Sequence, residues 1–273
     1  MFTPALLHAN HLALLGCPSC RGALDVSPGS EALRCARCGR AFPSVDGIFD
    51  TVLPDHVASE VSQAADHFEG LWGAIYSMGV TRPAVRAPYL QCLLGARDHR
   101  FAAAVRRYCA EARGPVLDVP VGGGAFLDAY AWPEADVIGV DLAPGMLLRA
   151  ERRARRRGLE RLSLLRADVA TLPLRNRSVH RIVSVNGLHC FPHRREALAD
   201  LRRCLADDGD LVGVTLLPGK HARADRAMAH AYRIGMFGPP TSEDELRGMA
   251  REAGFSRFEG EHEGAMLLFR FAP

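Results

Sequence analysis

Three consecutive glycines, Gly122 to Gly124, follow the acidic residue Asp118 in the stretch LDVPVGGGAFLDAY, residues 117–130. Glycines placed after an apolar run let the backbone approach a bound ligand closely. A dinucleotide-binding loop has the pattern G-x-G-x-x-G, and Leu127 stands where its third glycine is needed. A phosphate also requires free N–H groups or positive charge, whereas Asp118 brings a negative charge. The stretch therefore favours a cationic ligand over a phosphate.

The segments around this loop alternate between strand and helix patterns from residue 115 onward. The expected strands are PVLDV, DVIGVD, LSLLRAD, VHRIVSVN and DLVGVTLL. The expected helices are GAFLDAYAW, PGMLLRAERRARRRG, HRREALADLRRCLADDG and SEDELRGMAREAGF, and SRFEGEHEGAMLLFRF closes the chain as a hairpin. Strands that alternate with helices predict an α/β fold with a doubly wound, mainly parallel sheet. Its ligand is expected at the carboxyl ends of the strands.

The order of these motifs resembles that of the class I methyltransferases that use S-adenosylmethionine (SAM), a cofactor with an ammonium and a sulfonium. Asp118 and the following glycines resemble the family's first motif, with Pro120 where its first glycine is usual. The segments RIVSVNGLHCFP and LRRCLADDGDLVGVTLL resemble the later fourth-strand and fifth-strand motifs. The resemblance implies a Rossmann-like methyltransferase sheet over residues 113–273. It implies a cofactor site made of Asp118, Pro120, Gly122, Gly124, Asp141, Leu142, Met146, Asp168, Val169 and Asn186.

Two acids at strand ends have separate expected roles in such a site. Asp141 lies 23 residues after Asp118, where the resemblance implies that its carboxylate accepts both ribose hydroxyls. Asp168 is expected to meet the adenine amino group, and the N–H of Val169 a ring nitrogen. Either acid alone reads equally well as a helix cap or a solvated strand end.

The segment after the fourth strand is expected to face the transferable methyl group. Asn186 is expected to orient the methionine moiety or the acceptor, and His189 follows within reach of the acceptor. A histidine pKa suits a general base near neutrality, but a packed histidine that only positions the acceptor is an equal alternative. The neighbouring Cys190 reads as a small buried hydrophobe.

Two segments are expected to select the acceptor. One is a helix with an aromatic face that includes Phe68, Trp72 and Tyr76, within a helical lid over residues 54–112. The other is the insert after the fifth strand, with His221, His230, Tyr232 and Phe237. Aromatic residues at helical spacing also occur in ordinary cores, whereas loops at strand ends commonly carry specificity.

Four cysteines near the start of the chain have the spacing C-x2-C-x14-C-x2-C: Cys17, Cys20, Cys35 and Cys38. Four thiolates complete a closed tetrahedral shell, so we expect a structural zinc. A module of this size, within residues 1–53, needs the metal for its folding energy. It resembles the zinc ribbons that precede some methyltransferases, including the 23S rRNA guanine-N1 enzymes, although those tend to have a histidine as fourth ligand.

Composition and charge place broad limits on the function of these 273 residues. The net charge of +3 is modest, and no apolar run is long enough for a membrane span. No secretory signal is recognised at the start, so a cytoplasmic protein is the default. Eight arginines against two glutamates fall in residues 149–166. Such a helix could contact RNA phosphates, although a solvated outer face is the simpler interpretation.

These observations predict a SAM-dependent methyltransferase acting on a small molecule, in secondary or quinone-like metabolism. One alternative is an rRNA base methyltransferase that uses the zinc ribbon to grip RNA. Another is a methyltransferase-like module that binds SAM or a partner without turnover, because Pro120 departs from the usual glycine loop.

Overall fold

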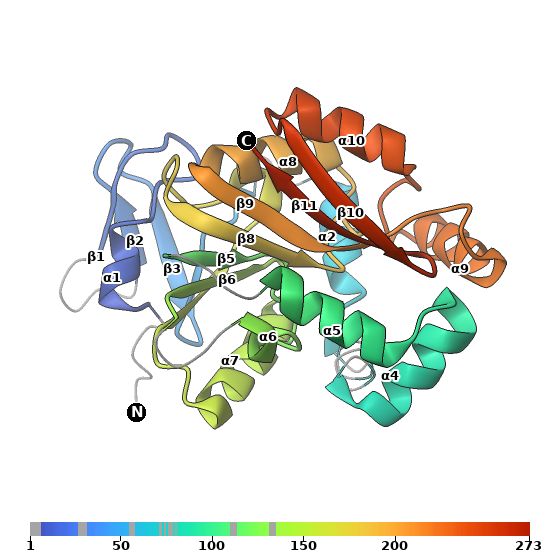
Figure 1. Ribbon diagram of the computed structural model, residues 1–273. Helices are drawn as coiled ribbons and strands as arrows, with labels where there is room; N and C mark the ends of the chain where they lie inside the picture. The colour runs from blue at the N-terminus through green and yellow to red at the C-terminus, as the bar shows by residue number, and fades with distance from the viewer. Residues whose placement is uncertain are drawn as a thin grey trace.

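The protein is represented by a computed structural model that describes residues 7–26, 32–54, 58–70, 73, 75, 79, 81–109, 114–130 and 135–273. Within these ranges the strands form one 11-stranded sheet with helices on both faces (Figure 1). The strand order is β1-β2-β3-β4-β7-β6-β5-β8-β9-β11-β10. No helix among these residues is both long and apolar enough to cross a bilayer.

The strands of the N-terminal part are β1 (Leu24–Val26), β2 (Ala32–Cys35), β3 (Ala41–Val45) and β4 (Ile48–Asp50). The remaining strands are β5 (Val116–Asp118), β6 (Val137–Asp141), β7 (Leu162–Arg166), β8 (Val179–Val185), β9 (Leu205–Leu216), β10 (Arg257–Glu263) and β11 (Met266–Ala272). The helices before β5 are α1 (Ala9–Leu12), α2 (Ser59–Asp66), α4 (Pro83–Tyr89), the π-helical η1 (Leu90–Leu94) and α5 (Asp98–Cys109). Those after it are α6 (Leu127–Tyr130), α7 (Pro144–Arg157), the 3-10 helix η2 (Val169–Thr171), α8 (Arg194–Cys204), α9 (Ala222–Arg233) and α10 (Glu243–Glu252).

The central strands confirm the predicted doubly wound sheet. β4, β7, β6, β5, β8 and β9 are parallel, and β11 and β10 add antiparallel at one edge. From β5 the chain winds outward through β6 and β7, then crosses back to β8 on the other side of β5. Open parallel sheets bind ligands at such a switch point, beyond the carboxyl ends of the strands.

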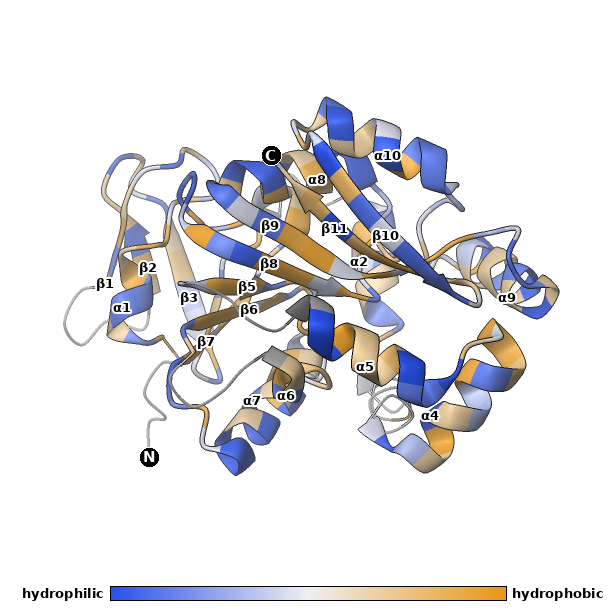
Figure 2. Ribbon diagram, in the orientation of Figure 1, coloured by the Kyte–Doolittle hydropathy of each residue, from blue (hydrophilic) through white to orange (hydrophobic). Residues whose placement is uncertain are grey.

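Alternating side chains of the strands supply two cores, one on each face of the sheet. Leu117 and Ile182 belong to a cluster with α8, α10 and the N-terminal strands, whereas Val116 and Val183 belong to one with α5, α7 and α9. A strand buried on both faces must be apolar throughout, since successive side chains point to opposite faces. Figure 2 accordingly shows apolar central strands and a largely polar outer surface on α7 and α10.

Helix signals in the sequence mark the ends of two helices correctly. Ser242 caps α10 in a reciprocal capping box with Glu245, as the spacing of the two residues predicts. Pro144 begins α7, and Gly158 follows its end in the left-handed conformation at φ +65°.

The predicted helix over residues 193–209 is too long at its C-terminal end. α8 stops at Cys204, and β9 begins at once with Leu205, which is fully buried and pairs with Val179 of β8. Burial of Leu205 and its ladder pairing override the helical pattern of residues 205–209, because tertiary contacts outweigh local propensity.

The N-terminal cysteine-containing part joins the main sheet directly. The sequence predicts one short strand leaving that part, whereas residues 41–50 form the hairpin β3–β4, and β4 pairs in parallel with β7. An ion pair between Arg166 and Asp50 (2.6 Å) supports this pairing, and Arg166 Nε donates to the carbonyl of Leu142 (3.0 Å). The N-terminal strands and the cofactor-side strands thus form one continuous sheet.

The segment 54–112 does not act as a single lid. Phe101, Ala104 and Val105 of α5 are buried in the core beneath β9 and β11. α2 lies instead beyond the carboxyl ends of the central strands, where its residues line a cleft.

Candidate cofactor and acceptor site

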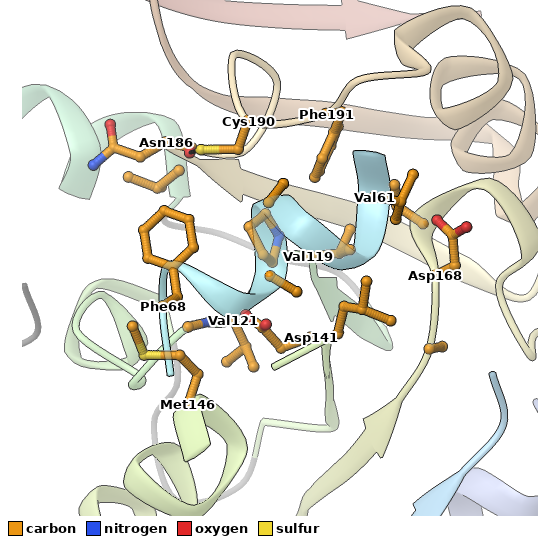
Figure 3. Close-up of a pocket in the computed structure, with 18 of the residues that line it drawn as sticks. Val61, Phe68, Val119, Val121, Asp141, Met146, Asp168, Asn186, Cys190 and Phe191 are labelled. Atoms are coloured by element: carbon orange, nitrogen blue, oxygen red, sulfur yellow. Dashed lines mark hydrogen bonds between the residues drawn. The ribbon is translucent and has the colours of Figure 1, made fainter. Parts of the chain in front are cut away.

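A cleft opens at the switch point between β5 and β8 and encloses about 1100 Å³ of space, part of it open to solvent. Its walls come from the loops after β5, β6, β7 and β8 and from one face of α2. Figure 3 shows side chains from these separate segments around the same space. The fold therefore gathers, from distant parts of the chain, most of the residues that the sequence assigns to a cofactor.

The glycine loop contributes its backbone to the cleft at one position. Gly122 lines the cleft with φ +52°, and a Cβ added there would meet no protein atom within 4 Å. A side chain at residue 122 would therefore occupy ligand space. Gly124 is absent from the lining, and its Cβ would come within 3.2 Å of Ala150 Cα in α7. Gly124 thus permits close helix packing rather than ligand contact.

Pro120 lines the cleft in place of the family's usual glycine and follows a cis peptide bond. Its ring packs against the backbone after β8, since a Cβ on Gly187 would lie 2.4 Å from Pro120 Cδ. The Pro120 ring therefore requires a residue without a side chain at position 187.

Asp141 connects the two loops on the cofactor side. Its Oδ2 accepts from the N–H of Gly122 (2.8 Å), and its Oδ1 accepts from that of Ala143 (2.9 Å). Burial raises the pKa of Asp141 to about 6, although these backbone N–H groups oppose the shift. A carboxylate at the cleft wall retains lone pairs for further donors, which suits a pair of hydroxyl groups.

The other acids differ in their access to the cleft. Asp168 lines it, accepts from the N–H of Ala170 (3.0 Å), and has a pKa raised by burial. Leu142, Met146 and Val169 also line it. Asp118 ends β5 and is 4% exposed, but it lies outside the lining.

Asn186 occupies the end of β8 in a left-handed conformation, at φ +60°. Asparagine tolerates this conformation better than most residues, because its short polar side chain bonds locally. Its N–H donates to Val214 on β9 (2.8 Å), which fixes the turn, and Asn186 lines the cleft. Cys190 Sγ donates to the Asn186 carbonyl (3.3 Å), and burial raises the pKa of Cys190 to about 12.

His189 lies outside the cleft lining, in a small neighbouring pocket. Its Nδ1 accepts from the N–H of Leu216 and contacts Thr215 Oγ1, both at 3.3 Å, and its ring packs edge-on to Phe237 at 4.6 Å between centroids. Burial lowers the pKa of His189 to about 3. These contacts favour a packed, neutral ring that supports the loop after β8 over a general base.

Apolar side chains outside the cofactor motifs also line the cleft, and of these the sequence predicted only Phe68. They include Val61, Ala64, Ala65, Phe68, Val185, Phe191 and Pro192. Figure 3 shows Phe68 and Phe191 on different sides of the space that Asp141 also borders. Phe68 belongs to the aromatic helix face that the sequence assigns to the acceptor, and it does line the cleft.

The other residues predicted for acceptor selection are not found in the described lining of the cleft. Trp72 and Tyr76 are outside the described residues. His230 and Tyr232 are exposed on α9, and His221 lies against Gly95. Phe237 packs on His189, so none of these four lines the cleft. The insert instead supports α2 from outside, since His67 Nε2 bonds the carbonyl of Ile234 (2.8 Å).

The four N-terminal cysteines come together as a candidate metal centre. Their sulfur atoms all lie within 4.8 Å of one another, with Cys17–Cys38 at 3.8 Å and Cys20–Cys35 at 3.4 Å. Ligands of one tetrahedral zinc with Zn–S bonds of 2.3 Å would be separated by about 3.8 Å. Cys35 Sγ also accepts from the N–H groups of Arg37 and Cys38. Burial alone would raise the pKa of Cys35, but these donors lower it to about 7. The donor set fits zinc.

Two family models match separate parts of the chain. Residues 116–209 match the methyltransferase domain family, and residues 9–47 match the Trm112p-like protein family. A doubly wound sheet with a cleft at its switch point occurs in many α/β folds, and the match of residues 116–209 identifies a methyltransferase domain among them. The chain carries such a SAM-dependent domain, preceded by a Trm112-like ribbon on the edge of the same sheet.

Individual relatives agree with this division. Demethylmenaquinone methyltransferase of Thermus thermophilus is 36% identical over 38% of this chain and 47% of its own length. An uncharacterized chloroplastic methyltransferase of Arabidopsis thaliana is 25% identical over 88% of this chain and 69% of its own. The chain spans about half the length of several curated relatives that it matches.

A solved complex of the Haloferax volcanii Trm112 methyltransferase activator with a methyltransferase shares the fold. Its TM-score is 0.56 at 17% identity, and the similarity covers 77% of this chain and 96% of that one.

Proposed function

We propose that this chain transfers a methyl group from SAM to an apolar small molecule of quinone-like or secondary metabolism. The observation that carries the proposal is the composition of the cleft. The loops after β6 and β7 present the acids Asp141 and Asp168, whereas α2, the residues after it and the loop after β8 add apolar side chains that include Phe68 and Phe191. The first group forms a wall that suits a polar, cationic cofactor. The second forms an apolar wall that suits a flat or branched apolar acceptor. Burying an apolar acceptor against this surface is favourable, whereas burying a charged acceptor there costs its hydration.

SAM supplies the electrophile, and the residues of the chain supply binding and alignment. Asp141 would hold the ribose hydroxyls, Gly122 would leave space beside them, and Asp168 with the N–H of Val169 would meet the adenine. Asn186 would orient the methionine end next to the acceptor. The apolar wall excludes water and fixes the acceptor for in-line attack on the methyl carbon. The identity of one relative as a demethylmenaquinone methyltransferase supports a quinol-like acceptor.

A direct test offers the purified protein SAM with acceptors of graded polarity, and follows both S-adenosylhomocysteine and the mass of the acceptor. Reduced short-chain naphthoquinols and substituted phenols represent the apolar class, and small amines the polar class. Extracted RNA, with and without ribonuclease, represents the nucleic-acid class. We expect methylation to be confined to the apolar class. Methylation of RNA alone would reject the proposal.

We also propose that the Trm112-like ribbon holds one structural zinc through Cys17, Cys20, Cys35 and Cys38. The sulfur spacing and the N–H donors around Cys35 support it. Cys35→Ser should release this zinc and unfold the ribbon, because the metal supplies much of its folding energy. Elemental analysis and limited proteolysis would follow both effects. A reduced wild-type protein without thiolate-bound zinc would reject the assignment.

A further inference from the structure

A second group of metal-ligand types lies where the N-terminal segment meets the main sheet. His11, at the end of the short helix α1, is completely buried, and His8 precedes that helix. The ring of His11 points toward Asp136, immediately before β6, with 3.4 Å between Nε2 and Asp136 Oδ1. One ligand atom from each of His8, His11 and Asp136 lies within 4.8 Å of the others.

The other ring nitrogen of His11 is already fixed by a hydroxyl group. Nδ1 lies 2.6 Å from Ser163 Oγ, and the same oxygen accepts from the backbone N–H of His8 (2.9 Å). A histidine that binds a metal almost always donates its second N–H to an oxygen in this manner. With Nδ1–H donating to Ser163, Nε2 presents a lone pair toward the Asp136 carboxylate.

Nε2 of His11 lacks a hydrogen-bond partner among the described residues, although it is within ion-pair distance of Asp136. In the tautomer with Nδ1–H bonded to Ser163, a buried lone pair faces the Asp136 carboxylate, and the two groups conflict unless a proton or a cation lies between them. The other tautomer supplies that proton as Nε2–H, so the metal-binding form is the one with Nδ1–H. In that form, a cation between the two groups removes the conflict.

The distance and the surroundings of Asp136 also suit a metal. Two ligands of a tetrahedral zinc with bonds of about 2.0–2.1 Å are separated by about 3.4 Å, which is the Nε2–Oδ1 separation found here. Arg161 holds the Asp136 carboxylate with two hydrogen bonds, 2.8 Å and 2.6 Å. Carboxylate ligands are commonly oriented by such outer partners. The N–H contact from Asn10 to His8 Nδ1 is long, 3.4 Å, and exposed, so it constrains the ring weakly.

We propose that His8, His11 and Asp136 form a second metal site, distinct from the four cysteines, for a first-row divalent ion such as Zn²⁺. Two imidazoles and a carboxylate are typical ligands for such ions, with a water in the fourth position. The site fastens the segment before the ribbon to the β6–β7 part of the sheet. Metal at this point would therefore hold the Trm112-like ribbon against the methyltransferase domain.

The test measures bound Zn²⁺ in the full-length, reduced protein. Apo-protein is titrated with Zn²⁺ against a chromophoric chelator, and the loaded protein is then analysed for zinc per chain. We expect two classes of site, a tight one from the cysteines and a weaker one. His8→Gln should abolish the weaker class and leave the tight class unchanged, because His8 lies outside the ribbon cysteines and is only half-buried.

Two further variants exclude a folding effect. Ser163→Ala should retain the weaker class with about 10–100-fold lower affinity, since Ser163 orients the His11 ring and the His8 backbone but is not itself a ligand. His99→Gln, at an exposed histidine elsewhere, should change nothing. The proposal is overturned by a single class of zinc in the wild type. It is also overturned if the second class remains at full affinity in His8→Gln. Zinc binding by the four cysteines and methyltransferase activity are measured in separate assays, so failure of the second metal site would leave both of those proposals untouched.

Discussion

The two walls of the cleft are built in different ways. The cofactor wall consists of residues at or just after the ends of β5, β6 and β7, and it contributes two acids and backbone N–H groups among apolar side chains such as Leu142 and Met146. The acceptor wall consists of α2 and the loop after β8, and it contributes apolar side chains. Parallel strands bring their carboxyl ends to one edge, so the first wall follows from the fold itself. The second depends on the packing of a helix from a distant part of the chain.

The largest effect we expect falls on the cofactor wall. Asp141→Ala removes an acceptor for the Gly122 and Ala143 N–H groups and for the ribose hydroxyls. Hydrogen bonds to a charged group contribute about 1.5–3 kcal/mol, so SAM affinity should fall by about 10–150-fold. Titration calorimetry measures this directly. Unchanged SAM affinity in a folded Asp141→Ala protein would remove Asp141 from the site.

A pH titration sharpens the same point. The pKa of Asp141 is raised to about 6 by burial, so its carboxylate gains a proton as the pH falls through 6. SAM affinity should then fall by up to about tenfold per pH unit below that value, because the neutral acid is a poorer acceptor. The raised pKa of Asp168 acts in the same direction. Asp141→Asn should flatten the dependence.

Protonation of Asp141 at low pH does not unfold the protein, so unfolding caused by this group cannot explain a loss of SAM affinity. Between about pH 4 and pH 6 the folded state binds the Asp141 proton more tightly than the unfolded state. The contribution of Asp141 to stability therefore increases as the pH falls. A melting curve recorded at each pH provides the control.

The same contrast explains what the sequence could predict. Asp141 ends β6 and Asp168 follows β7, and both line the cleft, which the sequence could predict because the carboxyl ends of parallel strands converge. Val61 and Phe191 could not be assigned, since an apolar residue that lines a cleft has the same local pattern as one in a core. The β4–β7 pairing was also missed, because three residues carry no information about a partner more than a hundred positions away.

Two residues on one loop test the acceptor wall. Phe191 lines the cleft, whereas His189 faces the neighbouring pocket and Phe237. Phe191→Ala should raise the acceptor KM by about 10–100-fold, the value of burying one aromatic side chain, with SAM affinity nearly unchanged. His189→Ala should mainly lower the melting temperature. A stable His189→Ala protein with normal acceptor KM and no turnover would restore a base role for His189.

The smallest effect is expected on the outer helix α7. Its buried residues Met146, Leu147, Ala150 and Ala154 face the sheet, so most of its arginines face outward. Arg157 pairs with Asp128 at 2.9 Å, but both side chains are about half-exposed, and such pairs contribute about 0–1 kcal/mol. Replacing the arginines at 152, 153, 156 and 157 with glutamine should therefore leave turnover of an apolar acceptor nearly intact.

An RNA acceptor predicts the opposite for this variant. Each arginine that neutralises a phosphate would add about 0.7–0.9 log units to the fall in affinity per decade of salt. The glutamine variant would then bind RNA more weakly and with a smaller salt dependence, while still binding SAM. Turnover assays at two salt concentrations, with calorimetry for SAM, separate the outcomes. Loss of activity with SAM binding retained would show that the acceptor binds the outer surface of α7 and would contradict binding at the apolar wall of the cleft. Retained activity at both salt concentrations would leave selection of the acceptor to α2 and the loop after β8.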